Sequence, residues 1–413
     1  MLFRSQAMES GDLVRFEQLC QSLYSATDPS ERQSAESALA TFGSSSEHIS
    51  QCEAVIDQST HPYALLVAAT ALTKLVTTHW NNFTSEQRVD IRNYLFNVLG
   101  HKGTTLEPFV VVCFVQLVCR ITKMGWLESP VHKEIVADTQ KFLDASIEHY
   151  LIGLQIFNQL VLEMCQNSPS RSVTQHRRTA VSFRDTCLLK IMQTGLTTVK
   201  KMRSGEAKVD DPVLFNKLAE QSLMIMQNCL SFDFLGTTPD ESGEDVGAVQ
   251  VPSNWSHIFE ESEIMDMLFA MLSELPGTLV PRCLQVLVLF LSVRRSIFST
   301  DTKRHEFLER GLRAVDTLVR ARIMWTDEGC YHEFCRLLSR LKSNYQLNEM
   351  VTLDVYDSFI EGVASFTFES FRQLTVAANS LYYILSLWSR LVAAIPYLRS
   401  SKPSKLADFA PDI

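Results

Sequence analysis

The chain has 413 residues, of which 46% are hydrophobic and 21% are charged, and this balance excludes an intrinsically disordered protein. Its formal net charge is −9 at pH 7, so it lacks the basic excess with which proteins bind nucleic acid or anionic membrane surfaces, and we expect neither as a partner. An acidic surface suits a partner with a basic face, and it equally suits a protein that is merely soluble in the cytosol.

Apolar residues recur at three- and four-residue steps along nearly the whole chain, and this period predicts helices. One helix is predicted to begin at Pro62, because proline is tolerated in the first helical turn. The next helix follows Thr84, where a capping-box-like pattern starts, and is predicted to end at Gly100. A third helix is predicted from Pro108 to Gly125, so helix follows helix with only short connections.

The spacing of these helices indicates a repeat. Pro62 and Pro108 lie 46 residues apart in the numbering, within the roughly 40–47-residue period of HEAT and armadillo repeats. Glycine (15 residues) and proline (13 residues) are scarce, and no alternation typical of β-strands persists. We therefore predict an all-α fold, a HEAT-like helical-repeat solenoid wound as a right-handed α–α superhelix. Helix pairs are predicted near residues 12–42, 47–80, 84–125, 130–165, 182–230, 256–299, 302–347 and 351–398.

Two breaks interrupt the helical pattern. Residues 167–178 are polar and basic, and residues 231–255 are rich in glycine, proline and acidic side chains, so both are predicted to be solvated loops rather than binding loops. A solenoid needs a polar repeat at each end, but residues 380–398 are apolar on much of their predicted helical surface. We therefore expect the sequence to correspond to part of a longer protein.

Cysteines and apolar runs bear on the cellular compartment. None of the ten cysteines forms a Cys-x-x-Cys pair, which is typical of reduced, buried thiols in the cytosol or nucleus. The first ten residues contain one arginine and no apolar run, which is not typical of a secretory signal. The longest strongly apolar runs, 109–119 and 283–293, are shorter than the roughly 20 residues that span a bilayer, so no membrane insertion is expected.

One segment, residues 331–347, holds residues of catalytic and metal-binding type. His332 lies three positions before Cys335 and just after Cys330, so a nucleophile with its base, a metal site and a packed helix are three alternatives. Zinc needs four ligands, and a catalytic thiol needs an electropositive pocket and a positioned histidine. We favour a packed helix, with His332 nearly opposite the buried face, Cys335 on its flank and Glu333 in solvent.

Other catalytic signatures are absent from the sequence, which contains no GxGxxG, GxxxxGK[ST], GxSxG or HExxH motif. Acidic pairs such as Glu260 and Glu261 stand at predicted helix starts, where carboxylates oppose the positive end of the helix macrodipole. We therefore expect neither an enzymatic activity nor a cofactor.

The N-terminal third carries two helical motifs. The segment QSAESALATF, residues 33–42, has the form AExxLxxF, and LLVAATALTKLVTTHW, residues 65–80, has the form AAxxLxxxVxxxW. A helix with an acidic, glutamine-containing start follows at residues 85–99. In this order the motifs resemble the N-terminal domain of the importin-β family. The matching residues are Ala35, Glu36, Leu39, Phe42, Ala68, Ala69, Leu72, Val76 and Trp80.

Further segments resemble one branch of that superfamily, the exportin-7 and Ran-binding protein 16 and 17 family. These are RITKMGW (120–126), HRRTAVSFRDTCLL (176–189), NCLSFDFLGTTPDES (228–242), SVRRSIF (292–298) and YHEFCRLLSRLKSNYQL (331–347). The resemblance covers essentially residues 9–413 and runs through loops as well as helices. Members of the family are much longer, so the chain resembles only their N-terminal portion.

The resemblance implies a nuclear transport receptor of the exportin type, acting in both directions. Such a receptor binds Ran-GTP and folded protein cargo with a basic surface, and it passes nuclear pore complexes between cytoplasm and nucleus by contacts of FG nucleoporins with its outer helices. The implied domains are an N-terminal extension with the first helix (1–30), a Ran-binding importin-β N-terminal domain (31–100), HEAT-like repeats (101–400) and a truncated C-terminal tail (401–413).

The resemblance also implies a place for Ran, whose switch regions contact the inner, second helices of the first repeats in this family. Those helices map here to residues 33–42, 62–80 and 107–124. The polar residues that would lie near Ran are Glu36, Lys74, Thr77, Thr78, Arg120 and Lys123. Many family members have asparagine where Lys74 stands, and each residue could instead be ordinary exposed helix surface.

Two other functions remain open. The first is a helical-repeat scaffold for protein interactions without Ran-regulated transport activity. The second, an enzyme that uses His332 and Cys335, ranks last because no feature of the sequence indicates a substrate.

Overall fold

The computed structural model describes the chain except for a few short segments. Residues 1–7, which belong to the predicted N-terminal extension and first helix (1–30), and most of the predicted acidic loop at 231–255 lie outside the described residues. Contacts divide the chain into two compact units, Met1–Phe183 and Arg184–Ile413. The described ranges are 8–45, 48–166, 172–207, 209–232, 248–321, 323–325, 327–400 and 402–413.

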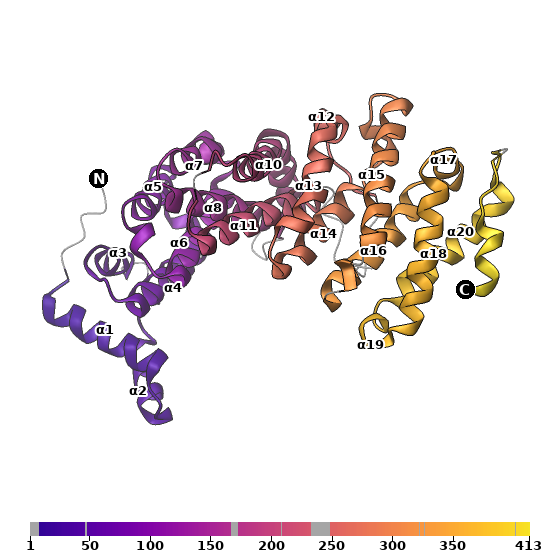
Figure 1. Ribbon diagram of the computed structural model, residues 1–413. Helices are drawn as coiled ribbons and strands as arrows, with labels where there is room; N and C mark the ends of the chain where they lie inside the picture. The colour runs from indigo at the N-terminus through magenta and orange to yellow at the C-terminus, as the bar shows by residue number, and fades with distance from the viewer. Residues whose placement is uncertain are drawn as a thin grey trace. The chain divides into compact units, whose positions relative to one another are not determined.

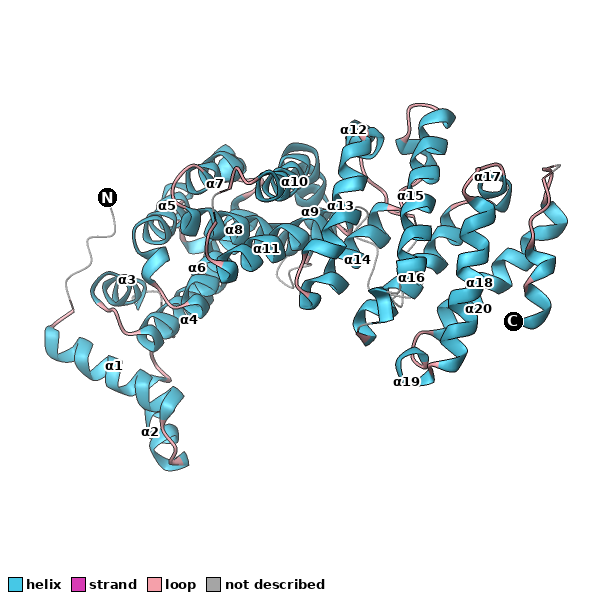
Figure 2. Ribbon diagram, viewed as in Figure 1, coloured by secondary structure: helices cyan, strands magenta, loops and turns pink. Residues whose placement is uncertain are grey.

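The first unit consists of helices joined by short loops (Figures 1 and 2). Within each of the first four pairs the helices pack against each other, and the second helices α4, α6 and α8 contact one another in series, while α1 packs on α4. Its helices are α1 (Ser10–Ser25), α2 (Pro29–Leu39), α3 (His48–Gln58), α4 (Pro62–Thr78), α5 (Ser85–Lys102), α6 (Pro108–Gly125), α7 (Ile135–Leu143), α8 (Ile147–Cys165) and α9 (Val173–Phe183).

The second unit also has a continuous series of second helices, and its first helices α15 and α18 pack against each other. Here α11, α14, α16 and α20 form the series of second helices. Its helices are α10 (Leu189–Ser204), α11 (Pro212–Leu230), α12 (Ser256–Glu260), α13 (Ser262–Glu274), α14 (Val280–Phe290), α15 (Asp301–Ala321), α16 (Glu328–Asn344), α17 (Leu347–Val351), α18 (Tyr356–Arg372), α19 (Leu374–Ala377) and α20 (Leu381–Ala394).

The predicted all-α, HEAT-like helical-repeat architecture is confirmed. No strand is assigned in the parts of the chain that the structure describes, where one isolated β-bridge joins Val249 and Val293. The predicted helix pairs follow one another in the predicted order. Each unit is a row of two-helix repeats, in which a repeat contacts chiefly its neighbours.

Local signals placed the ends of the central helices of the first unit. Pro62 and Pro108 occupy the first turns of α4 and α6, as predicted. The capping box is also confirmed, because the Thr84 hydroxyl accepts a hydrogen bond from the Gln87 N–H and the Gln87 side chain accepts one from the Thr84 N–H. The predicted end of α5 at Gly100 is wrong, since the helix continues to Lys102, whose ammonium donates to main-chain oxygens at the end of α3.

The helix α6 is the core of the first unit. Among the described residues it is the one helix long and apolar enough to cross a membrane by length and composition. Its apolar stretch covers Pro108–Gly125 and is therefore longer than the predicted apolar run at 109–119. However, 67% of it is buried, because α4, α5 and α8 all pack against it. A core helix of a helical-repeat protein meets the same length and composition test.

The basic segment predicted as a loop at 167–178 is helical in part, because α9 begins at Val173. His176, Ala180 and Phe183 are buried at three- and four-residue steps, and the Phe183 ring meets that of Trp126 at 5.6 Å. The polar residues between them hid this narrow apolar stripe in the sequence.

The interior helix α16 is buried more widely than predicted. It lies between α14 and α20, so residues on both of its flanks lose contact with solvent. Glu333, expected in solvent, is 7% exposed and accepts a hydrogen bond from Gln285 of α14 at 2.9 Å. An interior helix of a repeat array has neighbours on several sides. A prediction that assigns it one apolar face therefore underestimates how many of its residues are buried.

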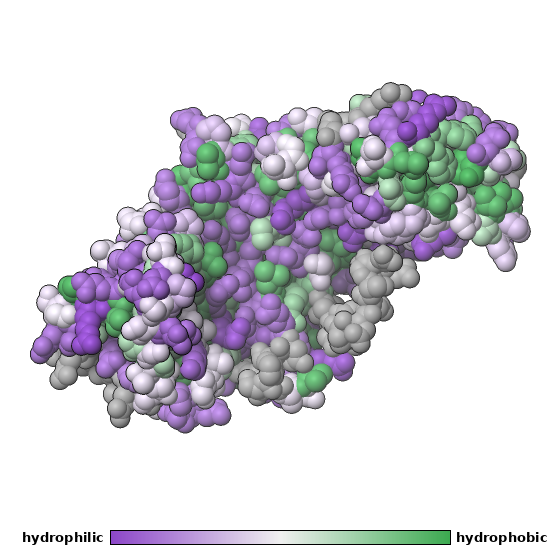
Figure 3. All heavy atoms as spheres, turned by 90° about the horizontal axis from the view of Figure 1, so that it is seen from below, coloured by the Kyte–Doolittle hydropathy of each residue, from purple (hydrophilic) through white to green (hydrophobic). Residues whose placement is uncertain are grey.

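In the last repeat α18 is covered by α15 and by the C-terminal segment, whereas α20 packs on α16. Residues 398–400 and 402–413, here called the C-terminal strap, run along α18, where the Tyr356 hydroxyl donates to the main-chain oxygen of Ser404 at 2.8 Å and Leu406 is fully buried. The free face of α20 and its surroundings carry exposed apolar side chains, which Figure 3 shows gathered at this end of the second unit. They include Phe371, Leu374, Tyr382, Leu385, Val392, Ile395 and Tyr397.

Candidate partner-binding grooves

A groove of about 630 Å³ runs across three neighbouring helices of the first unit, and we call it the α4–α6–α8 groove. The side chains that line it stand at three- and four-residue steps along α4 and α6, which places them on one face of each helix. Its lining residues are Thr70, Thr73, Lys74, Thr77, Thr78, Cys113, Gln116, Arg120, Gln159, Leu162, Glu163 and Gln166.

Four of the six residues predicted to lie near Ran come together in this groove. Lys74, Thr77 and Thr78 line it from the last turns of α4, and Arg120 lines it from α6. Glu36 is exposed on α2, which packs on α1, and is not among the lining residues.

Lys123 has a different environment from the one the sequence indicated. Its side chain is 2% exposed, and its ammonium donates to the main-chain oxygens of Glu163 (2.6 Å) and Gln166, which belong to the C-terminal turn of α8. These carbonyls have no partner within the helix, so the lysine caps α8 from α6. Lys123 therefore links α6 to the C-terminal end of α8 beneath the groove, and its charge is not exposed to a partner.

A compact charge network forms the floor of the groove. The Glu163 carboxylate is 3% exposed, pairs with Arg120 at 2.6 Å and lies 3.8 Å from the Lys123 ammonium. In contrast, no hydrogen bond or ion pair within the described residues reaches the exposed ammonium of Lys74. The charged residues that line the groove are thus two cations, Lys74 and Arg120, and one carboxylate, Glu163, so the lining has a net charge of +1 in a chain whose net charge is −9.

An aromatic ladder lies on the same face at the opposite ends of α4 and α6. The rings of Tyr24 and Tyr63 stack with centroids 5.0 Å apart, and those of Tyr63 and Phe109 stack at 6.0 Å. Tyr24 is 47% exposed and Phe109 is 39% exposed. This ladder was not predicted from the sequence, although Tyr63 and Phe109 each follow directly after a helix-opening proline, and this repeated proline–aromatic pattern could have indicated it.

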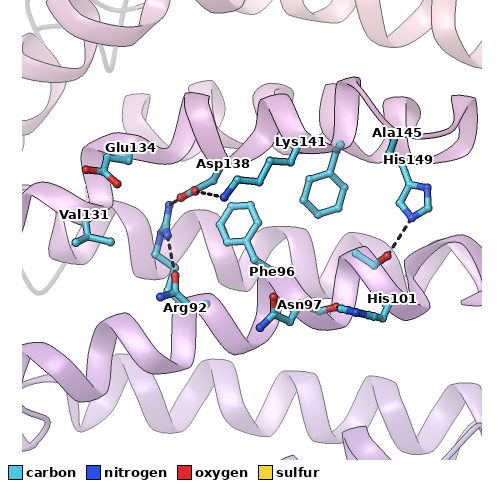
Figure 4. A pocket seen from close by; sticks show the side chains of 13 residues that line it. Arg92, Phe96, Asn97, His101, Val131, Glu134, Asp138, Lys141, Ala145 and His149 are labelled. Carbon is cyan, nitrogen blue, oxygen red and sulfur yellow. Dashed lines mark hydrogen bonds and ion pairs between the residues drawn. The ribbon is translucent and has the colours of Figure 1, made fainter.

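A second groove of about 710 Å³ lies between the first helices of two successive pairs, and we call it the α5–α7 groove (Figure 4). The rings of Phe96 and Phe142 form its floor, with centroids 6.0 Å apart. Arg92 spans its edge, pairs with Asp138 at 2.6 Å and lies over the Phe96 ring at 4.8 Å. His149 meets the main-chain oxygen of Gly100 at 3.0 Å and closes the other end.

The histidine and cysteines of α16 are packing residues. Cys330 and Cys335 are buried, and burial raises the pKa of the Cys335 thiol to about 12, which disfavours the thiolate. The His332 ring lies 2.9 Å from the Ser380 hydroxyl and packs edge-on against Tyr383, not opposite the buried face as predicted. Within the described ranges, no group of three or more His, Cys, Asp or Glu residues is placed to hold a metal ion.

Comparison with known proteins shows which proteins the chain resembles. Residues 35–101 match the family model described as the importin-beta N-terminal domain. The chain is 38% identical to Exportin-7-A of Xenopus laevis over 97% of its length, 39% identical to Ran-binding protein 17 of Homo sapiens over 98%, and 36% identical to Ran-binding protein 16 of Drosophila melanogaster over 97%. It spans 37% of the length of each of these relatives. An engineered protein of known structure aligns over 96% of the chain with a TM-score of 0.39 and 14% identity, which is too distant to bear on function.

The matched domain and the two-helix repeats define the chain as a helical-repeat protein of the importin-β type. Within that class it is a relative of exportin-7 and of Ran-binding proteins 16 and 17, and it corresponds to an N-terminal portion of these longer proteins. The relatives are named as exportins and Ran-binding proteins, names that describe transport receptors rather than enzymes.

Proposed function

We propose that this chain is the Ran-binding portion of a bidirectional, exportin-type nuclear transport receptor, and that it binds Ran-GTP at the α4–α6–α8 groove. The observation that supports this most strongly is the convergence of Lys74, Thr77, Thr78 and Arg120 in one groove. Three of these residues lie within the segment that matches the importin-beta N-terminal domain. The six-residue set is thereby reduced to four contact residues, with Lys123 supporting the floor and Glu36 apart on α2.

The proposed receptor has two further partners. We place the contact with FG nucleoporins at the α5–α7 groove, because Phe96 and Phe142 offer an aromatic floor to an inserted phenylalanine ring. Folded protein cargo with a basic surface would suit the net charge of −9. The proposed sites of action are the cytoplasm, the nucleus and the nuclear pore complex, and residues 31–100 are the proposed Ran-binding domain within the HEAT-like array.

A scaffold without Ran-regulated transport is the second candidate, and the length of the chain supports it. The chain spans 37% of the length of these relatives, and if the rest of such a protein also contacts Ran, this chain holds only part of that interface. Stable protein interfaces bury on the order of 1,600 Å², and losing part of one can cost orders of magnitude in affinity. A scaffold would bind FG peptides or cargo without sensitivity to the nucleotide on Ran.

Calorimetry on the 413-residue chain distinguishes the two candidates. Ran loaded with a non-hydrolysable GTP analogue is titrated into the chain at physiological salt, and Ran–GDP serves as the matched control. We expect at least tenfold tighter binding of the GTP form, equivalent to about 1.4 kcal/mol. Equal affinity for both forms, or binding of neither, would contradict the receptor function and leave the scaffold.

A further inference from the structure

We propose that the α4–α6–α8 groove and the adjoining aromatic ladder together receive one segment of the partner, and that this segment carries a carboxylate and an apolar side chain about 16 Å apart. The inference deepens the proposed function and rests on it, because the segment belongs to the surface of Ran in its GTP form. It names the chemistry of that surface from the residues of this chain alone.

The cationic end of the surface favours a carboxylate on the partner segment. Lys74 extends from α4 into the groove, and its ammonium has no counter-ion among the described residues. The one carboxylate lining the groove, Glu163, is neutralised by Arg120 and Lys123. Amide groups of Gln116 and glutamines of α8 also line the groove and can donate hydrogen bonds to a carboxylate oxygen. An incoming acidic group would meet excess positive charge, and the one buried carboxylate in the lining is already paired.

The aromatic end of the surface favours an apolar side chain on the partner segment. Stacked rings with edges in solvent, at Tyr24, Tyr63 and Phe109, are the kind of surface that buries a hydrophobic side chain at an interface. Val112, one turn further along α6, is 42% exposed and extends this apolar surface toward the groove. The His61 ring adjoins the ladder, with its centroid 5.9 Å from that of Tyr63, and its Nε2 lies 2.9 Å from the side-chain oxygen of Gln21.

The two ends have the same spacing on both helices. Tyr63 and Lys74 are eleven residues apart on α4, and Phe109 and Arg120 are eleven residues apart on α6. Eleven residues make almost exactly three helical turns, so each pair lies on one face, separated by about 16 Å. Between the ends, the lining is uncharged, with Thr70, Cys113 and Gln116. A straight segment of the partner, about five residues long if extended, would reach from one end to the other.

Charge reversal tests the cationic end. Lys74→Glu is compared with Lys74→Arg, which keeps the charge, and with Lys133→Glu, which makes the same charge change at an exposed lysine of the same unit outside both grooves. We expect Lys74→Glu to raise the Kd for Ran carrying the GTP analogue at least tenfold and to flatten its salt dependence. The two control variants should stay within about twofold of the wild type.

A second pair of variants tests the aromatic end. Phe109→Ser is expected to raise the same Kd about tenfold while leaving its salt dependence unchanged, because it removes apolar contact and no charge. Val14→Ser, at an exposed apolar residue of α1 outside the ladder, is the control. Circular dichroism and Tm confirm that each variant is folded.

The outcomes separate this inference from the function on which it rests. If the wild type prefers Ran with the GTP analogue but Lys74→Glu and Lys133→Glu weaken binding equally, or Phe109→Ser has no effect, the two-ended surface is wrong and Ran binds elsewhere. If the wild type binds neither nucleotide form, the proposed function fails, and the inference fails with it. Loss of affinity in both Lys74→Glu and Phe109→Ser, with the salt dependence flattened in the first variant and unchanged in the second, supports it.

Discussion

The fold of the first unit buries the carboxyl group of Glu53 in surroundings that disfavour its ionised form. It lies on α3 and is 3% exposed, and burial, followed by the negative charge of Asp57, raises its pKa to about 7. The Tyr94 hydroxyl donates to Asp57 at 2.8 Å and so supports the neighbouring carboxylate rather than Glu53. The folded unit therefore binds a proton at Glu53 more tightly than the unfolded chain does.

This pKa has a predictable sign in the stability of the protein. Because the folded value lies above the unfolded value of 4.5, the stabilisation is complete below about pH 4.5 and is lost as the pH rises through about 7. We expect Glu53→Gln to be more stable than the wild type at pH 8, on the order of 2 kcal/mol, and equally stable near pH 4.5. Thermal unfolding at the two pH values measures this, with the exposed Glu36→Gln as control. A variant that is less stable at pH 8 would contradict it.

At the scale of single residues, the sequence could indicate which residues belong to the candidate site, but not whether each side chain is exposed or buried. Lys74 and Lys123 both stand near the C-terminal ends of apolar helices in the sequence, yet Lys74 is exposed and Lys123 is buried. The partners of Lys123 lie 40 and 43 residues further along the chain, and no local pattern reports a contact over that distance. For the same reason Tyr24 could not be assigned to a ladder with Tyr63 and Phe109.

At the scale of helices, local signals predicted most of the fold. Proline in the first turn of α4 and α6 and the capping box of α5 act within one turn, so reading the sequence was enough to place these starts. The errors occurred where tertiary contact overrides local preference. The helix α5 passes Gly100 because Lys102 is held by α3, and α9 exists because its narrow stripe meets the core.

The link between α6 and α8 gives a prediction at this scale. Lys123→Met removes the donor that caps α8 and leaves the Glu163 carboxylate with Arg120 alone. Since the main-chain oxygens of Glu163 and Gln166 lose their donor and Glu163 loses one of its two cations, we expect the first unit to lose about 3 kcal/mol of unfolding free energy. Lys74→Met, at the exposed lysine of α4, should change it by less than about 0.5 kcal/mol.

Urea unfolding of both methionine variants, followed by circular dichroism, measures the difference. Equal effects of Lys123→Met and Lys74→Met would show that the capping contact contributes nothing to stability. A loss of Ran affinity in Lys123→Met without loss of stability would instead assign Lys123 to the contact surface.

At the scale of the whole molecule, stability is expected to be local. Each repeat contacts chiefly its neighbours, so a change in one repeat alters the opening of adjacent repeats more than that of distant ones. In the second unit the final repeat is held by the C-terminal strap, with Leu406 buried and Lys405 paired with Glu361 at 3.0 Å. The strap therefore sets how readily α18 opens to solvent.

Leu406→Ala tests this local control. The lost side chain leaves a cavity beneath the strap, and we expect amides of α17 and α18 to exchange with deuterium at least about tenfold faster, equivalent to about 1.4 kcal/mol in the opening free energy. Amides of the first unit should exchange at the wild-type rate. Uniform acceleration in both units, measured by hydrogen–deuterium exchange and mass spectrometry, would show that the chain opens as one cooperative body.

The equal eleven-residue spacing on α4 and α6 has a consequence for how the sequence can vary. Substitutions between Phe109 and Arg120 alter individual contacts, but inserting or deleting one residue would turn the two ends of α6 by about 100° relative to each other. The aromatic ladder and the groove would then face different directions, even if every side chain were retained. In these two helices, therefore, the number of residues between the two ends is as much a part of the surface as the residues themselves.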